Sequence, residues 1–156
     1  MREILFRGKL SKDGKWSKGN LVVNKRGVCI ITPDETPIGI YGQVIPETVG
    51  QFTGLTDKNG KEIFEGDIFK FPDEIWESCY TSCGTEYDSW TVENYGVVGF
   101  CEDTGRFDFI KYKFDENSVK ADLHENHDIE FCEFVSDLEI VGNIHDNPEL
   151  LGSEQE

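Results

Sequence analysis

Short runs of β-favouring residues, each ended by glycine, asparagine, aspartate or proline, recur along the whole chain. Valine, isoleucine and aromatic side chains pack well on a pleated sheet, whereas glycine, asparagine and proline favour turns and interrupt strands. This pattern predicts many short strands rather than helices, and therefore an all-β fold. With 156 residues, of which 11 are Phe, the chain has the length of one domain and enough bulky side chains to form a core without disulfides.

The extended runs are separated by turns that the sequence marks clearly. The runs that we predict to form strands are Arg2–Lys9, Val22–Ile31 with a turn at Asn24–Gly27, Ile38–Val44, Thr48–Leu55, Lys61–Phe64, Ile68–Phe71, Gly96–Cys101, Arg106–Asp115, Ile129–Val135 and Leu138–Ile144. The clearest hairpin joins 96–101 to 106–115 through a turn at 102–105. Its second strand places aromatic residues on both faces, which are Phe107 and Phe109 against Tyr112 and Phe114. Such a strand fits a curled or doubly covered sheet, and it also predicts a homo-oligomer.

Three other segments lack this regular pattern. Residues Asp73–Asn94 show no clean period, and we interpret them as an insertion or long excursion after a strand that Pro72 ends. We predict a short helix at Ser118–His127. We also predict a helical turn near the C-terminus, with Asn147 as its N-cap and Pro148 as its first residue.

The stretch Gln51–Phe71 combines glycine with many charged residues and raises the question of an active loop. Asp57–Gly60 and Glu65–Asp67 instead fit two tight turns. Asparagine and glycine tolerate a positive φ, and an aspartate side chain can bond to the backbone two residues further on. The large apolar residues between these turns are best explained by packing. We therefore interpret the stretch as strands and corners without a catalytic group.

The net charge of −16 is unevenly distributed along the chain. Residues 1–61 carry ten lysines and arginines against six acids, a net charge of +4, whereas residues 62–156 carry 5 against 25, a net charge of −20. An acidic surface of this kind serves solubility or contact with a basic partner, and it repels nucleic-acid phosphates. The basic N-terminal part leaves nucleic-acid binding as an alternative, through Arg2, Phe6, Arg7, Lys9, Lys12, Lys15, Trp16, Lys18, Lys25 and Arg26.

The sequence also indicates the setting of the protein. No apolar run approaches the ~20 residues of a membrane-spanning helix, and the N-terminal MREILFRGKL is too polar for a signal peptide. The cysteines are odd in number and widely scattered, which argues against a disulfide framework. These observations predict a cytoplasmic protein.

Candidates for metal or nucleophilic chemistry are sparse. Cys79 and Cys83 form one loose pair and His124 and His127 another, but structural zinc prefers close cysteine pairs with a matching second pair. A hydrolase that uses a Cys/His pair or two carboxylates is a further alternative without a local signature. The acidic pairs all lie at predicted turns, and they are Glu65/Asp67, Glu102/Asp103 and Asp115/Glu116. Phosphate-binding glycine motifs are absent, and we predict no catalytic residue, cofactor or metal ligand.

Two segments resemble the signatures of the YopX-like proteins. Gln51–Ile68, with the sequence QFTGLTDKNGKEIFEGDI, is similar to the central signature of that family, and Glu139–Leu151, with the sequence EIVGNIHDNPELL, is similar to its C-terminal signature. The opening Arg2–Arg7 also fits the start of the family, and the order and spacing agree across the chain. Asp73–Asn94 has no clear counterpart.

The resemblance adds expectations about setting, fold and role. The family is found mainly in bacteriophages and prophages of low-GC bacteria, which implies a phage or prophage protein in a bacterial cytoplasm. Its members imply an SH3-like barrel, so we expect a small, bent barrel with additional N-terminal strands. We assign one domain to residues 1–152, with an insertion at 73–94 and a flexible tail at 153–156. The family has no established activity, and we expect a non-enzymatic accessory protein that binds a host or phage protein through its acidic surface.

Overall fold

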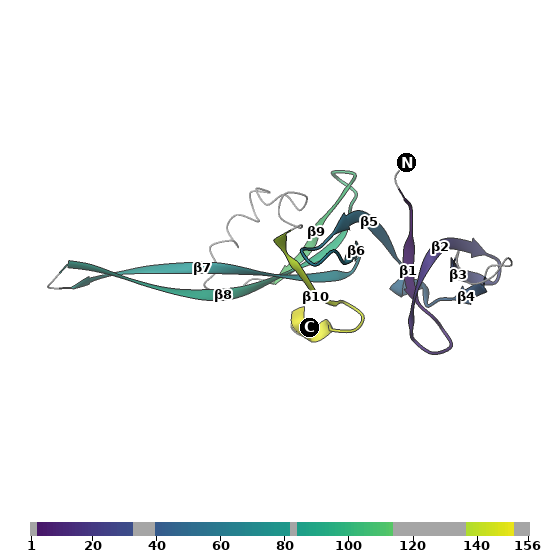
Figure 1. The fold of residues 1–156 in the computed structure, drawn as a ribbon, viewed down its shortest axis with the longest axis horizontal. Coiled ribbons are helices and arrows are strands. Elements are labelled where there is room, and N and C mark those ends of the chain that lie inside the picture. The colour runs from purple at the N-terminus through teal and green to yellow at the C-terminus, as the bar shows by residue number, and fades with distance from the viewer. Residues whose placement is uncertain (1–2, 33–39, 82–83, 114–136, 152–156) are drawn as a thin grey trace.

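The computed structural model describes residues 3–32, 40–81, 84–113 and 137–151. These residues form β-strands and two short 3-10 helices, which confirms the predicted all-β fold (Figure 1). The strands are β1 (Phe6–Lys9), β2 (Trp16–Asn24), β3 (Gly27–Thr32), β4 (Ile40–Gln43), β5 (Gly50–Thr56), β6 (Glu62–Phe64), β7 (Asp67–Thr81), β8 (Gly84–Cys101), β9 (Arg106–Lys113) and β10 (Glu139–Asn143), and the 3-10 helices are η1 (Pro46–Thr48) and η3 (Pro148–Leu151).

The strands form two antiparallel sheets. One sheet has the order β4-β3-β2-β1-β5-β6, and the other has the order β10-β7-β8-β9. The molecule is elongated, with the first four strands at one end and the hairpin of β7 and β8 extending to the other end (Figure 1). Within the described ranges, no helix is long and apolar enough to span a membrane.

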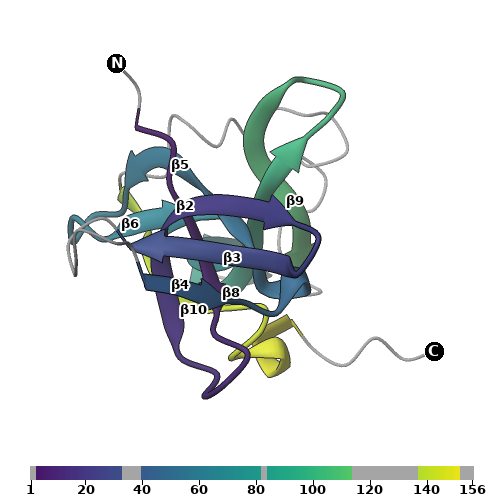
Figure 2. The ribbon, with the colours of Figure 1, turned by 90° about the vertical axis from the view of Figure 1, so that its right-hand side faces the viewer.

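The N-terminal sheet bends back on itself. Leu10 forms an isolated antiparallel bridge with Val44, and the backbone N–H of Ser11 donates to the Gln43 carbonyl at 2.9 Å. The end of β4 therefore meets the end of β1, although β2 and β3 lie between these strands in the sheet; Figure 2 shows this sheet from the front. Gly8 permits the approach, since a Cβ atom there would lie 3.2 Å from Val44 Cβ. The predicted bend is present, whereas the SH3-like barrel stays a prediction.

The predicted turns at Asn24–Gly27 and at residues 102–105 are confirmed, and each joins two strands into a hairpin. β2 and β3 are joined at Asn24 and Gly27, and the Asn24 side-chain oxygen accepts a hydrogen bond from Arg26 N at 2.7 Å. β8 and β9 are joined through residues 102–105, where Gly105 has a φ of +66°. Each turn is specified by residues within it, so local sequence is sufficient to predict it.

The predicted end of a strand at Pro72 is wrong. β7 continues through Pro72 as far as Thr81 and pairs with β8, which begins at Gly84. The proline is tolerated because β10 pairs with β7 only as far as Lys70, so one edge of β7 has no neighbour among the described strands at that point. Residues 73–81 and 84–94 thus form paired strands, and the origin of the segment 73–94 as an insertion stays a prediction.

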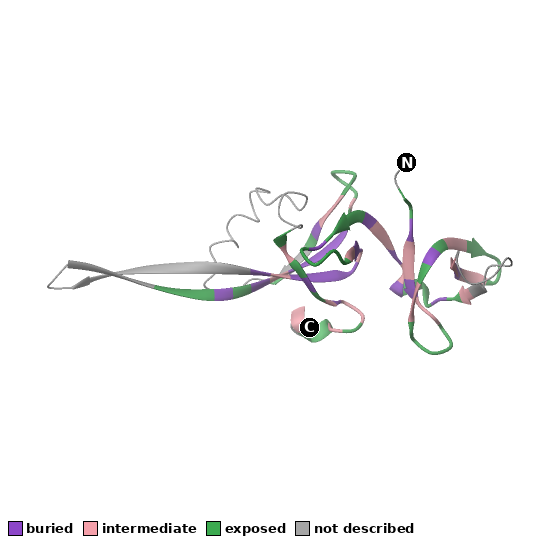
Figure 3. Ribbon diagram, viewed as in Figure 1, coloured by how far each residue is buried: buried purple, intermediate pink, exposed green. Residues whose placement is uncertain are grey.

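The main core lies between β6 and the four-stranded sheet. Figure 3 shows buried residues gathered where these strands meet. The rings of Phe69 and Phe109 meet edge to face with centroids 5.9 Å apart, while Ile110 on the next position of β9 is exposed. An aromatic pair of this kind adds ~0.5–1.5 kcal/mol beyond burial of its area. The buried members of the core are Ile63, Phe69, Val98, Phe109 and Ile140, with Phe107 and Leu138 packed against them.

The C-terminal helical turn is present as η3, which begins at Pro148 as predicted. The Asn147 side-chain oxygen accepts a hydrogen bond from Asn143 N at 3.4 Å, so this side chain faces β10. The predicted helix at 118–127, the predicted strand at 129–135 and the predicted tail at 153–156 lie outside the described residues.

Candidate functional site at the junction of the two sheets

Asp57 holds the first turn of the central signature and connects it to β10. Its Oδ1 accepts hydrogen bonds from the backbone N–H groups of Asn59 and Lys61 at 2.8 and 2.9 Å, and its Oδ2 accepts one from Ile140 N at 3.2 Å. Burial opposes ionisation of this carboxyl, but the three backbone hydrogen bonds outweigh burial and lower the pKa of Asp57. The predicted turn is confirmed, and it also fixes the last strand.

Asp67 has the same double role at the second turn. The residue is 1% exposed, and its Oδ2 accepts a hydrogen bond from Phe64 N at 2.8 Å. Its Oδ1 lies 2.7 Å from Nη2 of Arg7 and accepts a second hydrogen bond from Asn143 Nδ2 at 3.4 Å. One carboxylate therefore holds β1, the β6–β7 turn and β10 at a single point.

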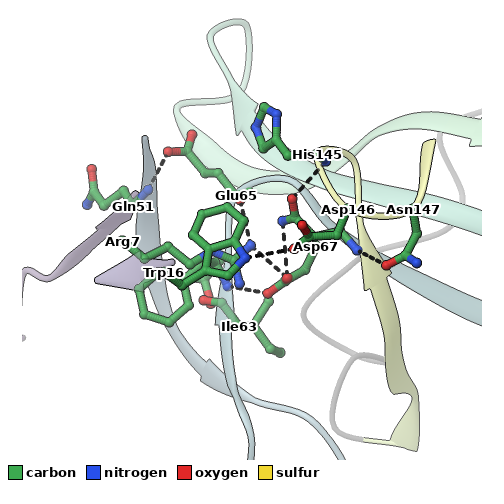
Figure 4. A network of polar contacts seen from close by, with 12 residues as sticks. Arg7, Trp16, Gln51, Ile63, Glu65, Asp67, His145, Asp146 and Asn147 are labelled. Carbon is green, nitrogen blue, oxygen red and sulfur yellow. Dashed lines mark hydrogen bonds and ion pairs between the residues drawn. The ribbon is translucent and has the colours of Figure 1, made fainter. Parts of the chain in front are cut away.

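The guanidinium of Arg7 lies close to two aromatic rings. Its Cζ is 4.8 Å from the ring centroid of Trp16 and 4.9 Å from that of Phe64, within the range of cation–π contacts. Nη2 also donates to the Glu65 carbonyl at 3.1 Å (Figure 4). Nε is buried without a hydrogen-bond partner in the part of the chain that the structure describes. Arg7 thus connects β1 to the turn between β6 and β7.

A second polar contact crosses the junction at Asp146, three residues after β10 ends. Lys9 Nζ lies 2.5 Å from Asp146 Oδ1, and Trp16 Nε1 donates to Asp146 Oδ2 at 2.7 Å. The hydrogen bond from Lys9, and after it the one from Trp16, lower the pKa of Asp146. The carboxylate is therefore ionised at neutral pH and holds β1 and β2 against the C-terminal segment.

His145 lies beside this ion pair. Its ring centroid is 6.2 Å from that of Trp16, and its backbone carbonyl accepts a hydrogen bond from Lys9 Nζ at 3.2 Å. Burial lowers the pKa of His145, and the positive charges of Lys9 and Arg7 lower it further. The imidazole is therefore neutral at pH 7 and adds no positive charge to the junction.

A pocket of about 260 Å³ opens next to this polar network. It is lined by η1 and the residue after it, by the β6–β7 turn, by β8 and β9, and by the segment that follows β10. Its charged or titratable lining residues are Glu47, Glu65 and His145, and its exposed large apolar residues are Phe100 and Ile110. The lining therefore combines strands β8 and β9 with segments that connect other strands or follow β10.

The geometry of the pocket is set by the strands around it. Glu65 is oriented because its Oε2 accepts a hydrogen bond from Gln51 N at 2.7 Å. Gly99 allows Ile110 to lie across β8, since a Cβ atom at position 99 would be 2.3 Å from Ile110 Cδ1. Phe100 beside it is 49% exposed. The arrangement suits a ligand group that is positively charged at its end and apolar along its length.

The described structure does not test most of the residues that the sequence offered for metal or nucleophilic chemistry. Among the residues described, no three His, Cys, Asp or Glu side chains form a group that can hold a metal ion. The side chain of Cys79 is not described, and Asp67 is engaged in the contacts above. The candidates outside the described residues are Cys83, Asp115, Glu116, His124 and His127.

The basic residues considered for nucleic-acid binding are partly engaged within the protein. Arg7, Lys9 and Lys18 each form an ion pair with an acidic residue that lies beyond position 61, and the Trp16 ring packs against Arg7. Arg7, Lys9 and the ring of Trp16 are therefore engaged within the protein and less available to phosphates or bases, whereas the ion pair of Lys18 is exposed. The residues of this basic set that lie at exposed positions are Lys12, Lys15, Lys18, Lys25 and Arg26.

The sequence does not indicate that Glu47 and His145 line a common pocket, or that the two signature segments meet. Both segments are rich in Asp, Asn and Gly, and this composition predicts turns without indicating that the turns meet. The structure shows the meeting directly, because Ile144 N donates to the Gly66 carbonyl at 2.9 Å.

The chain is similar in sequence to a protein family, and it is also similar to a solved structure. A crystal structure of protein EF1440 from Enterococcus faecalis is 20% identical in sequence, with 97% of this chain and 99% of that chain covered and a TM-score of 0.48. No curated protein matches the chain. A family model described as YopX protein matches residues 6–152 and thus includes both signatures, so the chain belongs to the YopX protein family.

Proposed function

We propose that the protein is a non-enzymatic accessory protein of a phage or prophage, and that it binds a positively charged surface of another protein. The observation that carries this proposal is the pocket at the sheet junction. Glu47 and Glu65 line it, and its described lining contains no lysine or arginine. Carboxylates in a concave site attract a cationic group and repel phosphates.

The charge distribution supports the same class of partner. Arg7, Lys9 and Lys18 are paired with acidic residues within the protein, which removes part of the basic character of the N-terminal strands. The chain carries 31 acidic residues against 15 lysines and arginines, so acids remain in excess. Complementary charges of this kind raise association rates and select the partner.

The side chains around the pocket favour binding over catalysis. Phe100 and Ile110 are 49% and 57% exposed beside the two glutamates, and protein interfaces commonly combine apolar contacts with a polar rim. The described lining contains no hydroxyl or thiol side chain that could act as the nucleophile of a hydrolase.

Affinity capture from bacterial cells that carry the phage or prophage, followed by mass spectrometry, tests the proposal. We expect a partner with a basic surface, and we expect the affinity of the purified pair to fall as salt rises, because charges are screened over ~8 Å at physiological ionic strength. An affinity that does not respond to salt would contradict the electrostatic proposal. A gel shift of DNA or RNA at low salt, without a protein partner, would favour the nucleic-acid alternative instead.

A further inference from the structure

We infer that the pocket between η1 and the β8–β9 hairpin receives one arginine side chain of the partner protein. The guanidinium lies at Glu47 and Glu65, and the methylene groups lie on Phe100 and Ile110. This inference rests on the proposed function and names the group that the partner contributes at the same site.

The size of the pocket limits what can occupy it. Its volume of about 260 Å³ is below the ~300–1,000 Å³ of pockets that enclose cofactors and other small molecules. A single long side chain from a partner is a smaller ligand, and it enters while the rest of the partner stays on the surface. The site therefore fits one anchor residue of a protein interface.

The two carboxylates suit a guanidinium. The hydrogen bond from Gln51 N to Oε2 of Glu65, at 2.7 Å, orients that carboxylate before a ligand arrives and so reduces the entropy lost on binding. Glu47 is exposed on η1 and forms no ion pair with any described residue. A guanidinium presents five N–H donors in a planar fork and can contact both acids at once, whereas an ammonium is a compact point charge.

The apolar part of the pocket suits the stem of the same side chain. Arginine buries its methylene groups along apolar surface while its charged end stays in a polar environment. Phe100 and Ile110 supply that surface, and the ring of Phe100 can also accept a guanidinium over its face. Ile110 reaches the pocket because Gly99 leaves room for it.

Positive charges near the pocket do not oppose a cationic ligand. Arg7 and Lys9 are neutralised by Asp67 and Asp146, with which they form ion pairs at 2.7 and 2.5 Å. His145 in the lining has a lowered pKa and is uncharged at pH 7. The charges that face the ligand at neutral pH are therefore those of the two glutamates.

The test uses the full chain with labelled isoleucine methyl groups and three acetylated, amidated peptides observed by NMR. The first is Ala-Leu-Arg-Leu-Ala, and the other two carry citrulline, a neutral isostere, or lysine in place of arginine. We expect a saturable shift of the Ile110 methyl resonance with the arginine peptide and roughly fivefold weaker binding of the citrulline peptide, the scale of ion pairs that are partly open to solvent. Equal affinity for the citrulline peptide, or no shift of the Ile110 methyl resonance, would overturn the proposed binding of arginine in this pocket. Tighter binding of the lysine peptide would overturn the choice of arginine.

Matched variants separate the pocket from the general acidity of the surface. Glu47→Gln with Glu65→Gln keeps an acceptor for Gln51 N, and Glu3→Gln with Glu102→Gln removes the same charge outside the lining. We expect only the first pair of substitutions to lower the affinity for the arginine peptide. An equal loss of affinity in both double variants would refute the inference. A captured partner can also bind in a salt-sensitive way and keep its affinity for the variant with Glu47→Gln and Glu65→Gln. In that case the binding of arginine in this pocket is refuted, whereas the proposed binding of a basic protein surface stands. If no protein partner with salt-sensitive affinity is found, the proposed function itself fails.

Discussion

Oδ1 of Asp67 lies 2.7 Å from Nη2 of Arg7, and this ion pair joins the first strand of one sheet to the first long strand of the other. The two side chains are 1% and 13% exposed. Removal of one partner from a buried pair leaves an uncompensated charge, which costs ~3–5 kcal/mol. We expect Arg7→Ala to lower the free energy of unfolding by about 3 kcal/mol, near the lower end, because Asp67 keeps other hydrogen bonds. Urea denaturation monitored by circular dichroism measures the loss.

Lys18→Ala is the matched control for that experiment. Lys18 forms an ion pair with Glu62 in which the side chains are 50% and 37% exposed, and such pairs contribute at most ~1 kcal/mol. Equal losses in Arg7→Ala and Lys18→Ala would show that the pair with Asp67 does not hold the junction.

The lowered pKa of Asp57 predicts a stability that depends on pH. Because its folded pKa is below the ordinary value of 3.8, the carboxylate contributes fully to stability above pH 3.8 and loses that contribution as the pH falls through the folded pKa. We expect Asp57→Asn to remove this part of the acid sensitivity, since the amide does not titrate. The variant also turns an amide donor toward backbone N–H groups, which costs ~1–3 kcal/mol near neutral pH. Urea midpoints between pH 2 and pH 7 test both effects, and an unchanged profile in the variant would contradict the assignment.

We expect substitution by alanine at two glycines of the junction to have different effects on stability. A Cβ atom at Gly50 would lie 2.6 Å from the backbone carbonyl oxygen of Glu65, whereas one at Gly99 would lie 2.3 Å from Cδ1 and 2.7 Å from Cγ1 of the exposed Ile110 side chain. Backbone cannot move as easily as a side-chain terminus, so we expect Gly50→Ala to cost ~1–3 kcal/mol and Gly99→Ala to cost less. Thermal denaturation of both variants measures the difference, and the reverse order would contradict the close approach at Gly50.

The homo-oligomer that the sequence predicts is open to a direct test. Phe109 lies in the core, whereas Ile110 at the next position of β9 is exposed and can be covered by a second copy. We expect light scattering at micromolar concentration to give a mass above the 17.8 kDa of one chain, and Ile110→Ser to lower it. The arginine peptide should compete with the second copy for the same residue. A strictly monomeric wild-type protein would refute the prediction.

Local features of the fold follow from the sequence, and the junction does not. Turns such as that at Asp57 are specified by the residues within them, so they were predictable. Arg7 and Asp67 are 60 positions apart and Trp16 and Asp146 are 130 apart, and no local pattern pairs such residues. The error at Pro72 has a similar cause, because a proline ends a strand only where its missing N–H is needed, and that depends on where β10 stops.

We predict that the acidic pocket at the sheet junction binds a basic surface of another protein. Titration calorimetry of the captured partner, at low and high salt, tests this claim most directly. We predict that the dissociation constant of the wild-type protein rises with salt, and that Glu47→Gln with Glu65→Gln weakens binding at low salt more than Glu3→Gln with Glu102→Gln does. A dissociation constant that is independent of salt and of all four glutamates would show that the acidic pocket does not bind the partner through charge.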